Sequence, residues 1–284
     1  MKRKKASLLS IYAILIIVGI ITLIPIIYTV SASFKTNAEI ATGGAHLIPK
    51  EFTFDNYKQV WTVGQEGNTF VTFTINSIFV SLLTVVGTVV TTSLSAYCFQ
   101  RRHFVGRTFL YNIFLATMFI GAGSITLFPT VQITAKLGLN NLFGVALVQT
   151  FTGSAANLFL TMGYLKTIPY DLDNAARIDG CGYFGIYWRI ILPLSKPILA
   201  TIALMTFRSS WNNYLLPNVM TAMKPKMQTL VVAVVKLQST GGSGATQYNL
   251  MMAGTMLAIL PILIIYLCMN RYFVEGTTAG AVKG

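Results

Sequence analysis

The sequence predicts an all-α, polytopic membrane protein with six transmembrane helices, a helical loop on the cytoplasmic side, and both termini in the cytoplasm. Hydrophobic residues make up 54% of the 284 residues and charged residues only 10%, whereas about a quarter of the residues of a soluble protein are charged. Apolar runs of roughly 20 residues, the length of a helix that crosses a ~30 Å hydrocarbon core, occur six times. Lysine and arginine are also divided unevenly between the two sides that these runs define.

The six apolar runs give the order of the expected elements. The expected spans are residues 8–30, 73–99, 108–131, 142–165, 194–216 and 250–270. The first run follows MKRKK and precedes VSAS, as a secretory signal would, but it is longer than the about 7–15 residues of a signal core. We therefore expect an uncleaved anchor. The expected organisation is an anchor helix and outer loop at 1–69, a core of five helices at 70–272, and a C-terminal tail at 273–284.

The basic residues orient the chain. With the N-terminus inside, thirteen lysines and arginines fall in the inner segments and seven in the outer segments. All seven outer residues are lysines, and every arginine in a loop lies inside. Because cytoplasmic loops usually carry the excess of positive charge, we expect a multi-pass protein of the cell membrane with both its N- and C-termini cytoplasmic.

The net charge and the cysteine positions argue against nucleic-acid binding, a disulfide framework and a metal site. The net charge of +13 does not indicate nucleic-acid binding, because the basic residues follow the sides of the membrane. Cys98, Cys181 and Cys268 show neither a CxxC spacing nor a cluster with histidine. Neither a disulfide framework nor a metal site is therefore indicated.

Two of the expected spans carry polar stripes. In the second span, positions three or four residues apart share one helical face: they are Ser77, Ser81, Thr84, Thr88, Thr92 and Ser95. The fourth span repeats the pattern with Thr150, Gly153, Asn157 and Thr161. Such stripes pack helices closely or line a pathway, and close packing is the commoner role.

Arg208 is the only full charge inside an expected span. An intramembrane arginine either faces a cavity or a partner, or extends toward the interface, here beside Trp211. The sequence leaves both roles open. The candidate residues of a translocation pathway are Asn157, Arg208, Trp211, Asn212 and Asn213.

Several motifs are absent from the sequence. No acidic residue lies inside an expected span, which argues against a carrier that couples to ions through carboxylates. The HExxH and GxSxG patterns of membrane hydrolases are missing, and so is the phosphate-binding GxxxxGK[ST] loop. We expect no enzyme activity and no directly bound cofactor. If the chain moves a solute against a gradient, another polypeptide must supply the energy and needs a docking site.

The loop between the fourth and fifth spans reads KTIPYDLDNAARIDGCGYFGIYWRIILPLSKP. Pro169 ends the fourth span, Asp171 stands at the expected N-cap of a short helix, and Asp173 lies in its first turn. Gly180 suits the C′ position that ends this helix. A second short helix is expected to have one face made of Tyr183, Ile186, Tyr187 and Ile190. Two such helices either dock a partner or lie along the lipid interface, and their shape fits both.

The same loop resembles the EAA motif of binding-protein-dependent ABC importer permeases. In that pattern, E-A-A is followed after three residues by G, and after nine more by I-x-L-P; Asn174-Ala175-Ala176, Gly180 and Ile190 to Pro193 match its spacing. Asn174 replaces the usual glutamate, so Asp173 or Asp179 would have to make any ion pair of that glutamate. The resemblance implies a loop at 166–193 that couples to an ATPase through Asp173, Asn174, Ala175, Ala176, Asp179, Gly180, Ile190, Leu192 and Pro193.

Two further segments are similar to maltose-type sugar permeases: WNNYLLP at 211–217 and RYFVEGTTAGAVKG at 271–284. The resemblance is to the shorter second permease subunit of carbohydrate importers. It implies import of a sugar or oligosaccharide, together with an external solute-binding protein, a second homologous permease, and two ABC ATPase subunits that bind ATP and Mg. The alternatives are a permease for a non-sugar solute, an ion-coupled secondary carrier, and a membrane scaffold protein.

Overall fold

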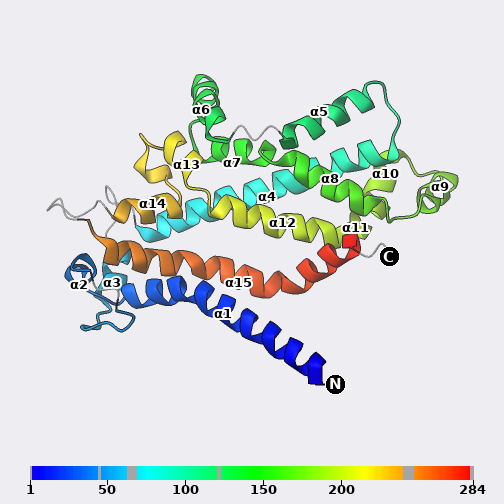
Figure 1. The fold of residues 1–284 in the computed structure, drawn as a ribbon. Helices are drawn as coiled ribbons and strands as arrows, with labels where there is room; N and C mark the ends of the chain where they lie inside the picture. The colour runs from blue at the N-terminus through cyan, green and yellow to red at the C-terminus, as the bar shows by residue number, and fades with distance from the viewer. Residues whose placement is uncertain (1, 44–45, 63–68, 120–122, 239–245, 282–284) are drawn as a thin grey trace. The chain divides into compact units, whose positions relative to one another are not determined.

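The computed structural model describes residues 2–43, 46–62, 69–119, 123–238 and 246–281, with side chains from residue 11 to residue 268 apart from 123 and 124. This part of the chain is helical and contains no β-strand (Figure 1). The all-α prediction is therefore confirmed. The chain divides into two compact units, the first formed by residues 1–72 and 230–260 and the second by residues 73–229 and 261–284.

Three helices of the described chain are long and apolar enough to cross a membrane: Ile11–Ala32, Phe70–Arg101 and Tyr248–Cys268. Two bent pairs of helices pass the same test when each pair is taken together, which gives up to five spans. These pairs are Leu142–Phe151 with Ser154–Leu165, and Tyr183–Leu194 with Lys196–Trp211. Five of the six expected spans thus correspond to helices or bent helix pairs of sufficient length.

The first unit contains the N-terminal helix, whose apolar window is exposed. It holds α1 (Lys2–Ala32), α2 (Asn37–Ala41), α3 (Asp55–Thr62), α14 (Leu230–Leu237) and the first part of α15 (Tyr248–Ala281). The Asn56 side chain joins three of these segments: its amide nitrogen donates to the carbonyls of Ser33 and Lys35, both at 2.8 Å. Its amide oxygen accepts a hydrogen bond of 2.7 Å from Asn249. Because Asn56 is only 3% exposed, these bonds satisfy a buried amide that would otherwise be costly.

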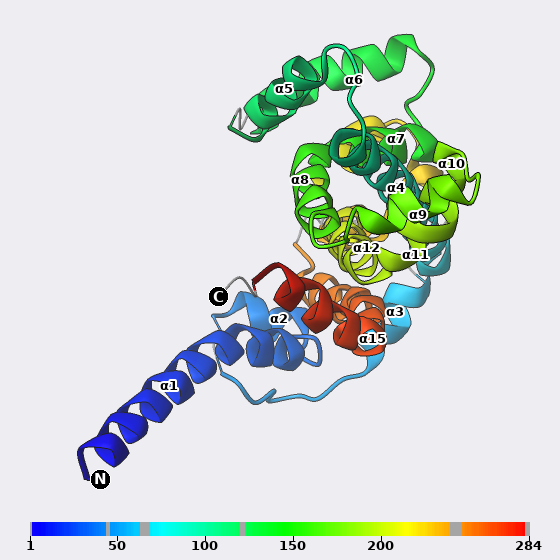
Figure 2. The same cartoon turned by 90° about the vertical axis from the view of Figure 1, so that its right-hand side faces the viewer.

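The second unit carries the features on which function depends. Its helices are α4 (Phe70–Arg101, from Phe73 on), α5 (Arg107–Phe119), α6 (Leu127–Lys136), α7 (Leu142–Phe151), α8 (Ser154–Leu165), α9 (Asp171–Ile178), α10 (Tyr183–Ile186), α11 (Leu192–Leu194), α12 (Lys196–Trp211) and α13 (Leu215–Met220). It also contains short 3₁₀ turns at Gly123–Thr126 and Pro225–Met227, a π-helical turn at Tyr187–Ile191, and the part of α15 from Pro261 on. Figure 2 shows α4, α8 and α12 next to one another.

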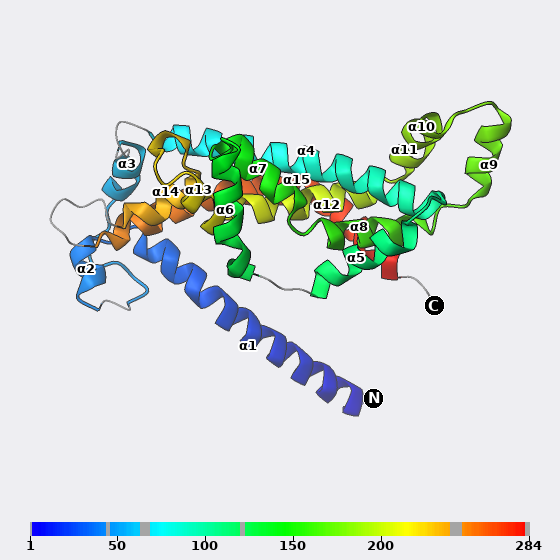
Figure 3. The same ribbon diagram turned by 90° about the horizontal axis from the view of Figure 1, so that it is seen from above.

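A buried cluster joins the end of α4 to the segment that follows α8. Tyr97 and Phe99 from α4 pack with Leu165 from α8, and Ala176 and Ile186 from α9 and α10 complete the contact. The α9–α11 segment lies at the end of the unit where α4 ends (Figure 3). The apolar packing therefore fixes this segment to α4 and α8.

The expectation of one continuous helix over 108–131 is wrong. Helix α5 ends at Phe119 and α6 begins at Leu127, after a 3₁₀ turn. The 3₁₀ turn Gly123–Thr126 has the sequence GSIT, and its glycine, serine and threonine are all poorer helix formers than alanine or leucine. The interruption thus follows from local propensity, although the segment is apolar enough to read as a span.

The fourth and fifth expected spans are bent. Helices α7 and α8 meet at 51°, and Gly153 at this break has a left-handed backbone with φ of +76°. The segment before α12 meets that helix at 74°, two residues before Pro197, whose ring and missing N–H disfavour a straight helix. The expected tail, residues 273–284, continues α15 as far as Ala281, and its last three residues lie outside the described chain.

Candidate functional site

The segment from α9 to α11, residues 171–194, is a candidate docking site that we call the knuckle. Its first helix begins differently from the sequence prediction: Tyr170, not Asp171, occupies the N-cap position, and its side chain makes no capping bond. Instead, the Tyr170 hydroxyl donates to the Gln100 carbonyl at 2.6 Å, and the ring lies 3.9 Å from the guanidinium of Arg101. The helix already includes Asp171, so the predicted N-cap is wrong.

The end of α9 confirms the expected role of Gly180. Its φ is +79°, a left-handed conformation that glycine adopts without strain. The Gly180 N–H donates to the Arg177 carbonyl at 3.0 Å and the Cys181 N–H to the Ala176 carbonyl at 2.9 Å. This pair of bonds is a Schellman motif, in which the carbonyls at a helix end find partners. A Cβ added at Gly180 would meet no atom within 4 Å, so the backbone conformation alone requires glycine.

Asp173 lies inside the knuckle and pairs with an arginine of α4. The Nε atom of Arg101 lies 3.5 Å from the Asp173 carboxylate, with side chains 0% and 3% exposed. Arg101 also donates to the carbonyls of Ile168, at 2.6 Å, and Leu165, at 3.4 Å. The motif predicted a coupling role for Asp173, whereas Arg101 was noted only as one of the basic residues on the inner side of the membrane. Nothing local marks the pair, because the two residues are 72 positions apart.

The second half of the knuckle differs from the expected helical face. Ile186, Tyr187 and Ile191 are buried, whereas the expected face included Tyr183, which is 61% exposed, and Ile190. The π-helical turn at Tyr187–Ile191 widens the helix, so that Ile191, five positions after Ile186, is buried in place of Ile190. The Tyr187 hydroxyl shares a hydrogen bond of 2.8 Å with Ser93 of α4.

The remaining residues predicted to couple to an ATPase differ in their exposure. Asn174, Ala175, Asp179, Gly180 and Pro193 are exposed, Ile190 and Leu192 are half-buried, and Ala176 is buried together with Asp173. Around the exposed group lie large apolar side chains, including Ile178 at 87% and Phe184 at 71% exposure. Exposed apolar groups this large are typical of a surface that contacts another protein or a membrane.

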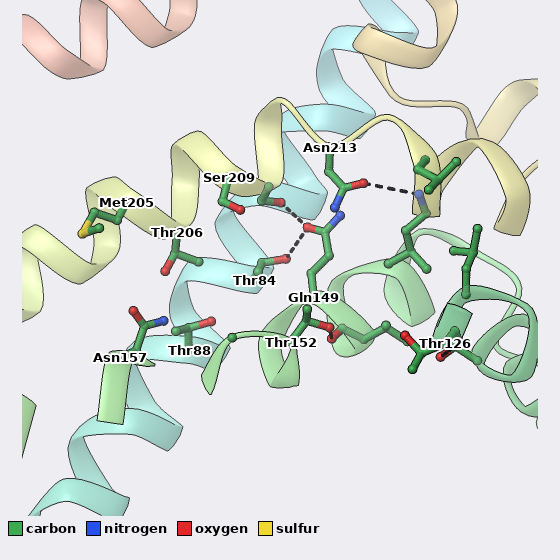
Figure 4. A pocket seen from close by; sticks show the side chains of 17 residues that line it. Thr84, Thr88, Thr126, Gln149, Thr152, Asn157, Met205, Thr206, Ser209 and Asn213 are labelled. Carbon is green, nitrogen blue, oxygen red and sulfur yellow. Dashed lines mark hydrogen bonds between the residues drawn. The ribbon is translucent and has the colours of Figure 1, made fainter. Parts of the chain in front are cut away.

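A second candidate site is a cavity of about 420 Å³ bordered by α4, α6, α7, α8, α12 and α13. It is lined by hydroxyl and amide side chains, among them Thr84, Thr88, Gln149, Asn157 and Asn213 (Figure 4). Gln149 extends from α7 toward α12, and its amide oxygen accepts a hydrogen bond of 2.5 Å from Ser210. The sequence did not single out Gln149. The feature that could have indicated this residue is that it is the one amide side chain in the apolar segment LFGVALVQTF.

The polar stripe of α4 is largely buried, and part of it borders the cavity. Its members are buried except for Ser95, which is half-buried. Thr84 and Thr88 reach the cavity, whereas Gly87 packs so closely on α7 that an added Cβ would lie 2.8 Å from the Thr150 hydroxyl. Close packing and a polar cavity therefore share one helix.

The candidate pathway residues are only partly brought together. Asn157 and Asn213 line the cavity, while Arg208, Trp211 and Asn212 are not among the residues that line it. Trp211 is 1% exposed and stacks on Phe207 with ring centroids 5.5 Å apart. Arg208 and Asn212 are exposed. The expected span did not indicate that α12 ends at Trp211, so that Asn212 and Asn213 follow the helix.

Comparison with known proteins identifies the class of this helical architecture. Residues 8–278 match the family of binding-protein-dependent transport system inner membrane components, and the chain belongs to this family. It is 34% identical to the galactooligosaccharides transport system permease protein GanQ of Bacillus subtilis, with 99% of this chain and 98% of GanQ covered. It is 32% identical to the arabinooligosaccharides transport system permease protein AraQ of Halalkalibacterium halodurans, with both chains covered completely.

A solved structure shares the fold. It is a chain of a bacterial ABC transporter involved in the import of the acidic polysaccharide alginate, and it superimposes with a TM-score of 0.77 at 28% identity. The similarity covers 93% of this chain and 95% of that chain. A multi-pass protein was expected from the apolar runs and an ABC importer permease from the loop motif, and this architecture is thus confirmed.

Proposed function

We propose that this chain is a transmembrane permease subunit of an ATP-driven ABC importer that carries a sugar or oligosaccharide across the cell membrane. The observation that carries the proposal is full-length similarity to oligosaccharide permeases, combined with a projecting knuckle whose helix ends in a Schellman turn. The proposal places both termini and the knuckle on the cytoplasmic side, in line with the distribution of lysine and arginine.

The proposed partners follow from the same architecture. A second homologous permease would complete the translocation pathway, two ABC ATPase subunits would dock at the knuckles, and an external solute-binding protein would deliver the saccharide. ATP and Mg would bind to the ATPase subunits, and this chain would hold no cofactor of its own. The exposed face of the knuckle, with Asn174, Ala175, Ile178 and Phe184, is the proposed contact with an ATPase.

The knuckle, besides binding an ATPase, would pass its movement on to α4. The Arg101–Asp173 ion pair and the Tyr170 hydrogen bond attach α9 to the end of α4, and the Tyr187–Ser93 bond attaches the following turn to the same helix. A displacement of the knuckle by an ATPase would therefore be passed to α4. Since α4 also carries Thr84 and Thr88 of the cavity, the motion would reach the residues proposed to face the solute.

The proposal is tested by replacing Gly180 with valine in cells that lack the natural copy of the chain. A β-branched residue strains the left-handed turn, so we expect saccharide uptake to fall at least tenfold while the chain remains in the membrane. Gly138→Val is the matched control, because Gly138 also has a left-handed φ, of +70°, and open space around it, but lies outside the knuckle. Equal uptake by Gly180→Val and wild-type cells would contradict the coupling role.

A purification from the native membrane tests the assembly. We expect the tagged chain to bring down a second permease and an ATPase in mild detergent, and the Gly180→Val variant to lose the ATPase but keep the permease. Purification of the wild-type chain alone, under conditions that preserve other ABC complexes, would contradict the proposed assembly.

A further inference from the structure

The polar side chains that line the cavity bordered by α4, α6, α7, α8, α12 and α13 are of one chemical kind. They carry hydroxyl or amide groups, as in Thr88, Gln149, Asn157, Ser209 and Asn213, and none of the described lining residues is charged. Arg208 lies one position from Ser209 on α12, yet it is exposed and does not line the cavity. The local environment therefore offers hydrogen bonds without offering a counter-ion.

Two buried polar groups at the cavity have no partner within the described protein. Gln149 is 8% exposed and its amide nitrogen makes no hydrogen bond, while its oxygen accepts from Ser210. Thr88 is 2% exposed and its hydroxyl also lacks a partner. Both residues line the cavity, with Thr88 beside Asn157 in Figure 4. Because buried polar groups are nearly always hydrogen-bonded, an unpaired donor and an unpaired hydroxyl in one cavity indicate a polar occupant.

The apolar part of the lining narrows the kind of occupant. Val148, Met205, Leu215 and Leu216 border the same space, so the cavity combines hydroxyl and amide groups with aliphatic surface. A saccharide presents the matching combination, because its hydroxyl groups lie at the edge of a ring whose faces carry C–H groups. The volume of about 420 Å³ lies within the range of small-molecule sites.

Charge decides between neutral and acidic saccharides. Placing a carboxylate in a site without a cation costs far more free energy than placing a hydroxyl that is hydrogen-bonded there. Carboxylates in proteins are usually held by arginine or lysine, and the described lining contains neither. The lining that this chain provides therefore favours a neutral sugar unit over a uronic acid unit.

We propose that this cavity is a subsite for an uncharged saccharide, in which the amide nitrogen of Gln149 donates to a sugar oxygen and the Thr88 hydroxyl makes a second hydrogen bond. The inference rests on the proposed import function and specifies its substrate class. Ser210 donates a hydrogen bond to the amide oxygen of Gln149. The amide nitrogen, which has no partner within the described protein, is therefore available to donate to the solute.

The experiment compares two threonines of α4 that differ only in their relation to the cavity. The hydroxyls of Thr88 and Thr92 are both buried and both lack a partner, but only Thr88 lines the cavity. Valine in place of either threonine removes the hydroxyl group. Because neither hydroxyl makes a hydrogen bond within the protein, both variants should fold. We expect Thr88→Val to lower uptake of a neutral oligosaccharide about threefold to tenfold, the effect of one hydrogen bond, and Thr92→Val to leave it within twofold.

Gln149→Leu provides a second variant, with Gln132→Leu as control because Gln132 is exposed on α6 and outside the lining. Uptake is measured in cells carrying the complete transporter, at saccharide concentrations that saturate external binding, so that it reports steps within the membrane. The probes are a neutral galactooligosaccharide, a neutral arabinooligosaccharide and an oligogalacturonide of equal length. We expect Gln149→Leu to reduce neutral uptake at least threefold, with Gln132→Leu unchanged.

The outcomes separate this inference from the proposed function. Uptake of the neutral probes, reduced by Thr88→Val and Gln149→Leu but not by their controls, supports the subsite. If wild-type cells take up the oligogalacturonide but neither neutral probe, the subsite is overturned and the importer function stands. The same conclusion follows if neither Thr88→Val nor Gln149→Leu reduces uptake of the neutral probes. Absence of uptake for all three probes, together with purification of the chain without a second permease or an ATPase, overturns the proposed function and the subsite with it.

Discussion

The ion pair between Arg101 and Asp173 provides a sharp test of how the knuckle is held. Asp173→Asn keeps the shape of the side chain and removes its charge, leaving a buried guanidinium without its counter-ion. Removing one partner of a buried pair costs about 3–5 kcal/mol. Arg101 retains two carbonyl acceptors and the Tyr170 ring, which compensate part of this loss. We therefore expect a loss near 3 kcal/mol in the stability of the α9 contact.

This loss is measurable as local opening of the knuckle in membrane vesicles. Trypsin cleaves after arginine, and Arg177 is exposed on α9, but cleavage requires the helix to open. When opening is faster than cleavage, the rate follows the open population. A change of about 3 kcal/mol then corresponds to an increase of about 100-fold. Asp179→Asn is the control, since it removes the same charge two residues from Arg177 at an exposed position.

The outcome for the control decides the interpretation. We expect cleavage of Asp179→Asn to stay within a few-fold of wild type. If Asp173→Asn were cleaved at the wild-type rate, or if both variants opened equally, the ion pair would not be what attaches α9 to α4.

Two further predictions concern packing and docking. Gly87→Ala brings a Cβ to 2.8 Å from Thr150, and this overpacking should lower stability by about 1–3 kcal/mol, whereas Gly163→Ala, which meets nothing within 4 Å, should raise it by about 0.5–1 kcal/mol. The thermal stability of the purified protein checks both, and equal effects would contradict the close approach of α4 and α7. Ile178→Asp, at a position 87% exposed, should leave folding intact and reduce copurification of an ATPase at least tenfold. Met223→Asp, at a position 94% exposed outside the knuckle, should leave it unchanged, and parallel losses would indicate a nonspecific effect of charge.

Features that depend on neighbouring residues were predictable from the sequence. Long apolar runs located α1, α4 and α15, because a run of apolar residues that can cross a bilayer is evident from composition alone. The left-handed turn at Gly180 was predicted because its causes, a glycine and a finished helix, lie within a few residues. The spacing of the surrounding motif indicated the family, because all its residues lie within one short loop.

Tertiary structure decided what depends on residues distant in the chain. Tyr170, the N-cap residue of α9, reaches Gln100, and the role of Asp173 is set by Arg101, 72 positions earlier. The cavity was only half predicted: Asn157 and Asn213 line it, but Arg208 and Asn212 do not. Gln149 became significant only when Ser210 and the α4 stripe were placed around it. A sequence shows which side chains can form hydrogen bonds or ion pairs, but only the packed helices determine which of them meet and which are left for a ligand.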